Sequence, residues 1–124
     1  MGVYCGTDII EVERIKKAIE ELGNKFLNEV YTEKEIKYCD SKKTMKYQHF
    51  AARFAGKEAV FKAISNLLKS KYDITWRDIE ILNEDNGKPY VNLNKEKVKD
   101  IVEIDISMSH IKEYAIANCI VILK

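Results

Sequence analysis

Glu58 and Lys62 are the two residues of this chain whose types and spacing point most directly to chemistry. They stand four apart in the segment 50–65, Phe-Ala-Ala-Arg-Phe-Ala-Gly-Lys-Glu-Ala-Val-Phe-Lys-Ala-Ile-Ser, and on a helix they share one face. A carboxylate and an ammonium there could hold a metal ion and the phosphates it binds. The alternative is an ordinary surface ion pair, worth only about a few tenths of a kcal/mol. Alanines at 51, 55, 59 and 63 let another element approach this helix closely, which leaves little free surface.

Asp8 is a second carboxylate in a position that needs an explanation. It follows the apolar start of the chain in Gly-Thr-Asp-Ile-Ile, and a carboxylate emerging from an apolar strand is costly unless it is paired, capped or metal-bound. Asp8 followed by Glu11 resembles a capping box that opens the next helix. From the residues alone, capping is favoured over metal binding.

Two further positions could contact a ligand. His110 ends the run Ile-Ser-Met-Ser-His, where it is either a surface residue or, with two hydroxyls before it, a phosphate contact. Gly87, Lys88 and Pro89 form a turn by default, and a loop whose backbone faces a ligand is the alternative. Acyl chemistry by Ser109 and His110 is disfavoured because neighbouring residues on a strand point to opposite faces.

The size and charge of the chain limit the classes of function. With 124 residues, residues 1–124 are expected to form a single domain with little room for a deep cleft around a large ligand. The 21 basic residues nearly balance the 20 acidic ones, which argues against a nucleic-acid-binding protein. The stretch 37–57 is locally basic, and it is either a solvated lysine-rich loop or a docking surface for an acidic partner.

The cysteines and the apolar runs predict the compartment. There are three cysteines, an odd number without metal-site spacing, and Cys5 and Cys119 lie in strand-like apolar runs that predict buried thiols. A reducing cytoplasm fits this pattern best. No apolar run reaches the length needed to span a membrane, and no signal peptide is recognisable.

The spacing of apolar residues predicts an α+β fold with a mostly antiparallel sheet packed on a long central helix. Residues 3–10 and 114–123 are expected to be strands, and so are 76–82, 90–93 and 104–108. The central helix is expected over about 47–68, and shorter helices over 11–22, 26–30, 33–39 and 96–101. Asn86-Gly87 is typical of a hairpin turn.

Together these segments resemble the small bacterial type of 4'-phosphopantetheinyl transferase, the holo-[acyl-carrier-protein] synthases, from end to end of the chain. The stretches that carry the resemblance, in the family's order and at similar spacing, are Gly6–Ile15, Arg53–Ala63, Trp76–Ile81, Gly87–Pro89 and Ser107–His110.

The resemblance implies an activity and a set of site residues. The enzyme would move the 4'-phosphopantetheine group of coenzyme A onto a serine of apo acyl carrier protein in fatty-acid biosynthesis, releasing adenosine 3',5'-bisphosphate. Asp8 and Glu58 would hold Mg²⁺ on the pyrophosphate, which replaces the capping interpretation of Asp8. Glu58 and Lys62 would be catalytic, with Lys62 on the phosphates. The other contacts to coenzyme A would come from Arg53, Gly87, Lys88, Pro89 and His110.

The resemblance also implies an assembly and a protein partner. Family members are typically trimers with active sites between subunits, which suits a chain of this size. The acidic carrier would dock on the helix after the first motif, at Arg14, with help from the basic stretch 37–57. One departure is the segment 64–72, where the family carries a glycine and this chain has none, so the central helix is expected to run longer.

Two rival functions remain open at this point. One is a non-catalytic module that binds an acidic protein through the stretch 37–57, and the other is a different Mg²⁺-dependent phosphoryl-transfer enzyme. The joint presence of Asp8, Glu58 and Lys62 favours the transferase over a binding module, which needs none of these residues in combination.

Overall fold

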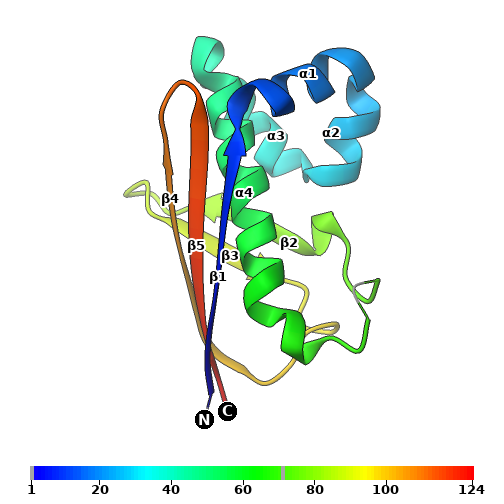
Figure 1. Ribbon diagram of the computed structural model, residues 1–124, viewed down its shortest axis with the longest axis vertical. Coiled ribbons are helices and arrows are strands. Elements are labelled where there is room, and N and C mark those ends of the chain that lie inside the picture. Colours follow the sequence, from blue (N-terminus) through cyan, green and yellow to red (C-terminus); the bar gives the residue numbers. More distant parts are fainter. Residues whose placement is uncertain (1, 71) are drawn as a thin grey trace.

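The computed structural model describes residues 2–70 and 72–124, and in it one long helix packs against a three-stranded sheet (Figure 1). The helix is α4 (Lys46–Ile64), and the sheet has the order β1-β5-β4, from β1 (Gly2–Glu11), β5 (Tyr114–Leu123) and β4 (Ile101–His110). Neighbouring strands run antiparallel, which confirms the predicted sheet type. The predicted α+β class is confirmed as well.

Smaller elements surround this unit. Helices α1 (Val12–Leu22), α2 (Asn24–Val30) and α3 (Glu33–Asp40) follow β1 and lie together at one end of α4 (Figure 1). Strands β2 (Ile79–Asn83) and β3 (Pro89–Leu93) form a separate antiparallel hairpin. Short 3-10 turns are η1 (Lys43–Met45), η2 (Ser65–Leu67) and η3 (Trp76–Asp78). Among the described residues, no helix is long and apolar enough to cross a membrane.

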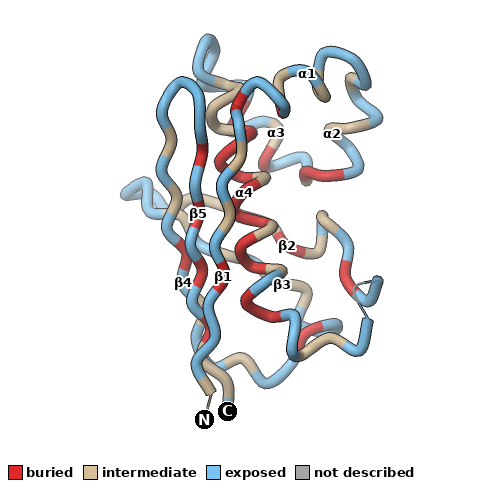
Figure 2. Tube along the Cα trace, viewed as in Figure 1, coloured by how far each residue is buried: buried red, intermediate tan, exposed pale blue. Residues whose placement is uncertain are grey.

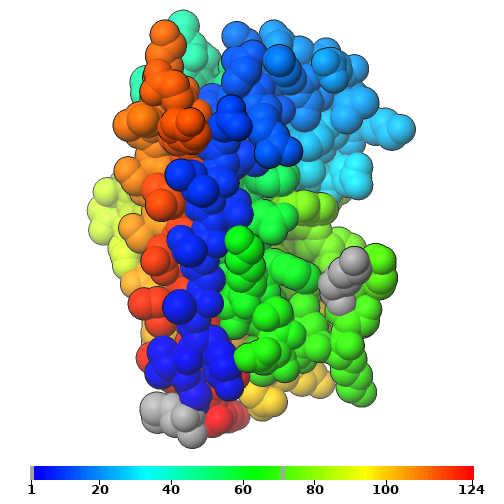
Figure 3. Space-filling view, in the orientation of Figure 1, coloured from blue at the N-terminus to red at the C-terminus, as the bar shows by residue number. Residues whose placement is uncertain are grey.

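Close approach between α4 and β1 is the contact that builds the site. Ala51, Ala55, Ala59 and Ala63 are all buried, as their spacing predicted. A Cβ added to Gly6 would lie 2.0 Å from the carbonyl oxygen of Ala59, so only glycine fits there. Figure 3 shows β1, in blue, lying along the green helix, and Figure 2 shows many buried residues along α4 and on the neighbouring strands.

The side chains of β1 alternate between α4 and the outer face of the sheet. Gly6 and Asp8 lie on the helix side, whereas Val3, Cys5 and Ile9 are exposed on the other side. The prediction that Cys5 is a buried thiol is therefore wrong, while Cys119 is buried. The alternation places Cys5 on the face that the rest of this chain leaves uncovered.

Two predicted elements differ from the structure because a side chain bonds locally to the backbone. The segment 96–101 is not a helix: Asn94 accepts from the backbone of Glu96 and Lys97 in a single turn, and β4 begins at Ile101. Residues 76–78 form a 3-10 turn rather than strand, since Asp78 accepts from the backbone of Thr75 at 2.8 Å.

The central helix also ends earlier than predicted. The α-helix stops at Ile64, and the Ser65 hydroxyl donates to the carbonyl of Lys62 at 2.9 Å as the chain tightens into η2. The missing glycine after Ala63 therefore does not lengthen the helix.

Candidate functional site

Asp8, Glu58 and Lys62 come together where β1 crosses α4, and these three residues are the carboxylate–lysine site. The Lys62 Nζ lies 3.2 Å from Asp8 Oδ1 and donates to the Thr7 carbonyl at 2.9 Å. Among the described side chains, Lys62 forms its ion pair with Asp8 on the strand, not with Glu58 one turn away. The pair interpretation from spacing alone is therefore wrong about the partner.

The capping interpretation of Asp8 is also wrong. β1 continues to Glu11, which is the N-cap of α1 and makes no side-chain capping hydrogen bond. The backbone N–H of Val12 donates to the carbonyl of Glu113 instead, at 2.8 Å. Asp8 therefore lies within the strand, and its carboxylate contacts Lys62 instead of capping a helix.

The electrostatics of the site disfavour the ionised form of the Glu58 carboxyl. Burial raises the pKa of the Glu58 carboxyl, the nearby Asp8 carboxylate raises it further, and Lys62 lowers it only in part. Two carboxylates that repel each other are a favourable environment for a cation. Lys62 is about half exposed and Asp8 less so, so the site is open to a ligand.

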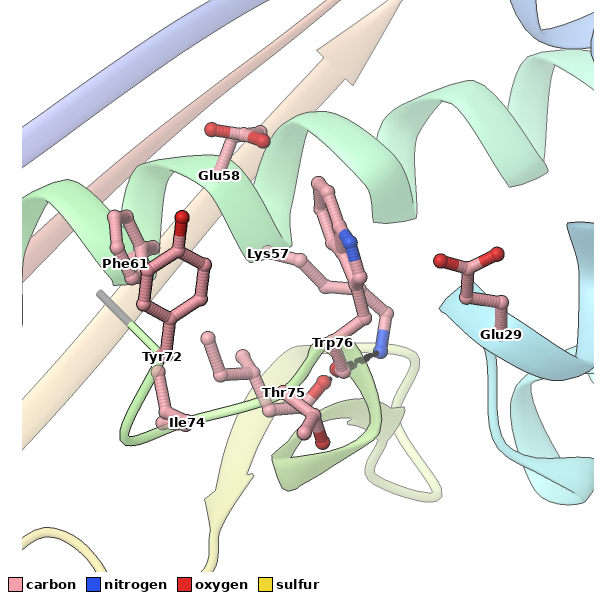
Figure 4. A pocket seen from close by; sticks show the side chains of 9 residues that line it. Glu29, Lys57, Glu58, Phe61, Tyr72, Ile74, Thr75 and Trp76 are labelled. Atoms are coloured by element: carbon pink, nitrogen blue, oxygen red, sulfur yellow. Dashed lines mark hydrogen bonds between the residues drawn. The ribbon is translucent and has the colours of Figure 1, made fainter. Parts of the chain in front are cut away.

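A cavity of about 450 Å³ adjoins Glu58 on the side away from β1 (Figure 4). One wall is α4, and the other is the segment 72–79. The apolar and aromatic part of the lining consists of Phe61, Tyr72, Ile74, Trp76 and Ile79. Its polar part consists of Glu29, Lys57, Glu58 and Thr75.

Arg53 belongs to a different group of residues. It precedes Lys62 by nine residues, about two and a half turns, so the two side chains leave α4 on opposite sides. Arg53 is buried, its guanidinium carbon lies 4.2 Å from the centre of the Tyr38 ring, and it donates to Asn83 Oδ1. Asn83 in turn donates to the carbonyl of Gly87 at 2.9 Å, which ties Arg53 to the β2–β3 turn.

The turn itself has the geometry that its sequence predicted. Gly87 has a φ of 89°, a backbone conformation that favours glycine, and its N–H donates to the carbonyl of Glu84 at 2.8 Å. Lys88 lies 3.3 Å from Asp105 and Pro89 begins β3.

His110 joins the same group from the end of β4. Its Nδ1 lies 2.8 Å from Gln48 Oε1, and its ring packs edge-on against His49 with the centres 4.9 Å apart. Burial lowers the pKa of His110, and the Arg53 charge lowers it further. Burial together with the His110 and Arg53 charges lowers the pKa of His49 to about 4. We call Arg53, the turn 87–89 and His110 the arginine–histidine cluster.

The predicted site residues thus fall into two groups rather than one. Asp8, Glu58 and Lys62 meet at the contact of α4 with β1, and the arginine–histidine cluster lies across α4 from them. Sequence reasoning did not single out Lys57 and Glu35, which form an ion pair at 2.7 Å with both side chains fully buried. Only the position of Lys57 beside Glu58 hinted at a role.

The basic stretch 37–57 does not form one continuous charged surface. Arg53 and Lys57 are buried, although they supply two of its positive charges, and only the remainder lies toward solvent. A surface-docking function therefore loses part of the charge on which it was based.

Comparison with known proteins agrees with this fold and these motifs. Residues 4–119 match the family model of the 4'-phosphopantetheinyl transferase superfamily. The chain therefore belongs to this superfamily, and it is an enzyme of the transferase class.

Individual relatives show to which branch of the superfamily the chain belongs. The chain is 46% identical to the holo-[acyl-carrier-protein] synthase of Ruminiclostridium cellulolyticum, over 99% of this chain and 94% of the relative. It is 45% identical to that of Protochlamydia amoebophila, over 94% and 95%. Among solved structures, the Helicobacter pylori holo-[acyl-carrier-protein] synthase in complex with coenzyme A is 31% identical, with a TM-score of 0.83 over 94% of this chain and 98% of that one. Within the superfamily, the chain belongs to the holo-[acyl-carrier-protein] synthases.

Proposed function

We propose that the protein transfers 4'-phosphopantetheine from coenzyme A to a serine of apo acyl carrier protein, in the presence of Mg²⁺, releasing adenosine 3',5'-bisphosphate. The observation that carries the proposal is the meeting of Asp8, Glu58 and Lys62 at one open point of the surface. We assign the reaction to fatty-acid biosynthesis in the cytoplasm, where free thiols such as Cys5 stay reduced.

The carboxylates of Asp8 and Glu58 are ligands of the kind that Mg²⁺ prefers. Magnesium prefers oxygen ligands and is usually held by one or two carboxylates, with substrate phosphates and water completing its shell. Asp8 and Glu58 supply two carboxylates, and the raised pKa of Glu58 reflects a repulsion that a cation would relieve. Across residues 2–70 and 72–124, no group of three or more His, Cys, Asp or Glu side chains could hold a metal by itself. The pair therefore suits an ion that arrives with its phosphates.

The transfer step follows from the charges of the carboxylate–lysine site. Bound Mg²⁺ would neutralise the pyrophosphate. The serine hydroxyl of the carrier attacks the phosphorus that bears pantetheine, and the bond from that phosphorus to the bridging oxygen breaks. Lys62 stabilises the negative charge that develops on the departing adenosine 3',5'-bisphosphate. The serine proton goes to Glu58 or to a water molecule beside it.

The division of the site residues into two groups supports a shared active site. Lys62 and Arg53 leave α4 on opposite sides, so a ligand held by the carboxylate–lysine site would meet the arginine–histidine cluster of a neighbouring copy. In that arrangement Arg53, Lys88 and His110 contact the adenosine end of coenzyme A, with Gly87 and Pro89 shaping the loop.

The outer face of the three-stranded sheet supports a homotrimer. Val3, Ile9, Ile116 and Ile120 are 45–67% exposed there, and Ile9 lies opposite Ile116 in the strand register. An exposed apolar patch of this kind is typical of a protein–protein interface, and most oligomers of one chain are closed and symmetric. We therefore propose that this face joins three copies.

We propose sites on the same surface for the remaining parts of the substrates. The apolar cavity beside Glu58 suits the pantetheine arm, which carries methyl groups and two amides. Arg14 and Lys17 are exposed on α1 and could dock an acidic carrier.

Mass spectrometry tests the proposal directly. The protein, coenzyme A and Mg²⁺ are mixed with apo acyl carrier protein, and the carrier is expected to gain one phosphopantetheine. A carrier whose modified serine is replaced by alanine is the control. No gain on several carriers that an authentic synthase modifies would reject the proposal.

A further inference from the structure

Lys57 is a fully buried lysine that uses all of its protons. Its ammonium has three N–H donors, and the structure provides three acceptors. The Nζ lies 2.7 Å from Glu35 Oε1, 3.0 Å from the Trp76 carbonyl oxygen and 2.5 Å from the Ile79 carbonyl oxygen. Figure 4 shows the side chain reaching from α4 to the backbone of Trp76 across the end of the cavity. A neutral side chain of similar length could not satisfy these three acceptors.

Glu35 is equally well satisfied from its own side. Its Oε1 accepts from the backbone N–H of Thr32 at 2.9 Å, which completes the capping box at the start of α3. Its Oε2 accepts from the backbone N–H of Ile81 at 2.9 Å. The ion pair thereby links three separate elements, α3, α4 and the start of the β2–β3 hairpin.

The two backbone carbonyls that Lys57 binds belong to one wall of the cavity, and Glu35 binds the N–H of Ile81 two residues beyond that wall. Trp76 and Ile79 line the cavity, and the carbonyl oxygen of each accepts a hydrogen bond from the Lys57 ammonium. The opposite wall is α4 itself, which carries Glu58 directly after Lys57. The distance between the two walls is thus set by the side chain next to the proposed catalytic carboxylate.

Fold stability alone is a weak reason for such a pair. Removing two charges from water offsets most of their attraction, and replacing a buried ion pair by apolar residues of similar volume is often neutral or stabilising. The geometric effect is more specific, because two hydrogen bonds from the Lys57 ammonium hold the wall, while the third contact, to Glu35, fixes the ammonium itself.

We propose that Lys57 and Glu35 are positioning residues that hold the 76–79 wall at the width needed to seat the pantetheine arm beside Glu58. The proposal rests on the proposed transferase function. It predicts that loosening the pair weakens binding of the arm and leaves binding of the adenosine end unchanged.

The experiment compares two ligands in the same variants. The double variant Glu35→Leu/Lys57→Met replaces the pair by apolar side chains, and Lys57→Arg keeps the charge but not the three-acceptor geometry. Dissociation constants are measured by calorimetry for coenzyme A, which has the arm, and for adenosine 3',5'-bisphosphate, which lacks it. For each variant we expect about a tenfold weaker affinity for coenzyme A, the order of effect of an imperfect apolar pocket. The affinity for adenosine 3',5'-bisphosphate should stay within about twofold of the parent.

A matched control removes a different ion pair on the same turn. Lys97 contacts Asp78 at 2.8 Å and is partly exposed, so Lys97→Met should leave both affinities unchanged. If either folded pair variant retains the parent ratio of the two affinities, or loses both equally, the positioning role is rejected. A parent protein that binds coenzyme A but fails to modify any carrier would reject the proposed function instead.

Discussion

Two lysines five residues apart on α4, Lys57 and Lys62, each pair with a carboxylate from another element, and the two pairs differ in burial. Lys57 and Glu35 are fully buried, and every donor and acceptor of the pair is used. Lys62 and Asp8 are 51% and 18% exposed, and their contact is longer, at 3.2 Å. The same chemical groups therefore form a fixed connection in one place and an open site in the other.

The difference shows what burial does to a charged pair. A buried and saturated pair has no capacity left for a ligand, and its removal leaves unpaired groups in an apolar interior. An open pair is screened by water and adds little to stability, but its charges remain available to phosphate or metal. Burial thus distinguishes the two lysines of the motif better than their spacing does.

The largest expected effect comes from substituting one member of the buried pair and leaving the other in place. Lys57→Met leaves the Glu35 carboxylate and two carbonyl groups without their partner, so the free energy of unfolding should fall by about 3–5 kcal/mol. Urea unfolding followed by circular dichroism measures the change. A loss below about 1 kcal/mol, the range of a surface pair, would show that the two pairs are energetically alike.

Substituting Lys62 in the open pair should lower the transfer rate rather than the stability of the fold. Lys62→Met removes the charge that faces the leaving group, and we expect phosphopantetheine transfer to slow about 100- to 1,000-fold, as when one transition-state donor is lost. The free energy of unfolding should change by less than about 1 kcal/mol. Lys25→Met, an exposed lysine on α2, is the matched control and should leave the rate unchanged.

Glu58→Gln should reduce activity while making the fold slightly more stable. The pKa of Glu58 is raised in the folded protein, so the native state holds this proton more tightly than the unfolded chain. Stability therefore falls as the pH rises through the window between the ordinary pKa of glutamate and the raised one. Above that window the variant lacks this penalty and should be more stable by up to about 1 kcal/mol, a figure reduced for partial exposure.

Titrating the parent checks the same assignment. Its Mg²⁺-dependent transfer rate should fall in acid as Glu58 gains its proton, starting above the pH range of an ordinary glutamate. Equal transfer rates for Glu58→Gln and the parent would contradict the role of Glu58 as a ligand.

The smallest expected effect is the coupling within the open pair. A double-mutant cycle with Asp8→Asn and Lys62→Met should give a coupling energy of about 0.2–1 kcal/mol in stability. The corresponding cycle for Glu35→Leu and Lys57→Met should give a coupling several times larger, because the single variants leave buried groups unpaired. Equal coupling energies would remove the distinction between the two pairs.

Most of the fold could be predicted because its signals are local. The alternation in 104–108, the alanine spacing in α4 and the Asn86-Gly87 turn each predict one element, and the structure confirms them. The segment 96–101 was misassigned because Asn94 opens a single local turn, in which its side chain accepts from the backbone of Glu96, and this local bonding outweighs helical spacing. Cys5 was misassigned because strand alternation does not say which face the rest of the chain covers.

The site was less predictable, because its meaning depends on partners that are distant in the sequence. Spacing pairs Glu58 with Lys62, yet Lys62 contacts Asp8, which lies 54 residues earlier. Lys57 and Glu58 are adjacent, and only the packing of α3 and the 76–81 segment shows that one is buried and the other open. The assignment of Asp8 to a site came from family resemblance, since local physics favoured a cap.

Mixing inactive variants tests most directly the claim that the two sides of α4 serve different active sites. One variant carries Lys62→Met in the carboxylate–lysine site, and the other carries Lys88→Met and His110→Ala in the arginine–histidine cluster. The two are unfolded together, refolded together so that mixed oligomers form, and assayed for transfer. Two variants of the same half, Glu58→Gln and Lys62→Met, form the control and should stay inactive when mixed. The account predicts about a quarter of the parent activity in the first mixture, because one interface in four combines two intact halves. A first mixture that stays as inactive as the control would contradict it.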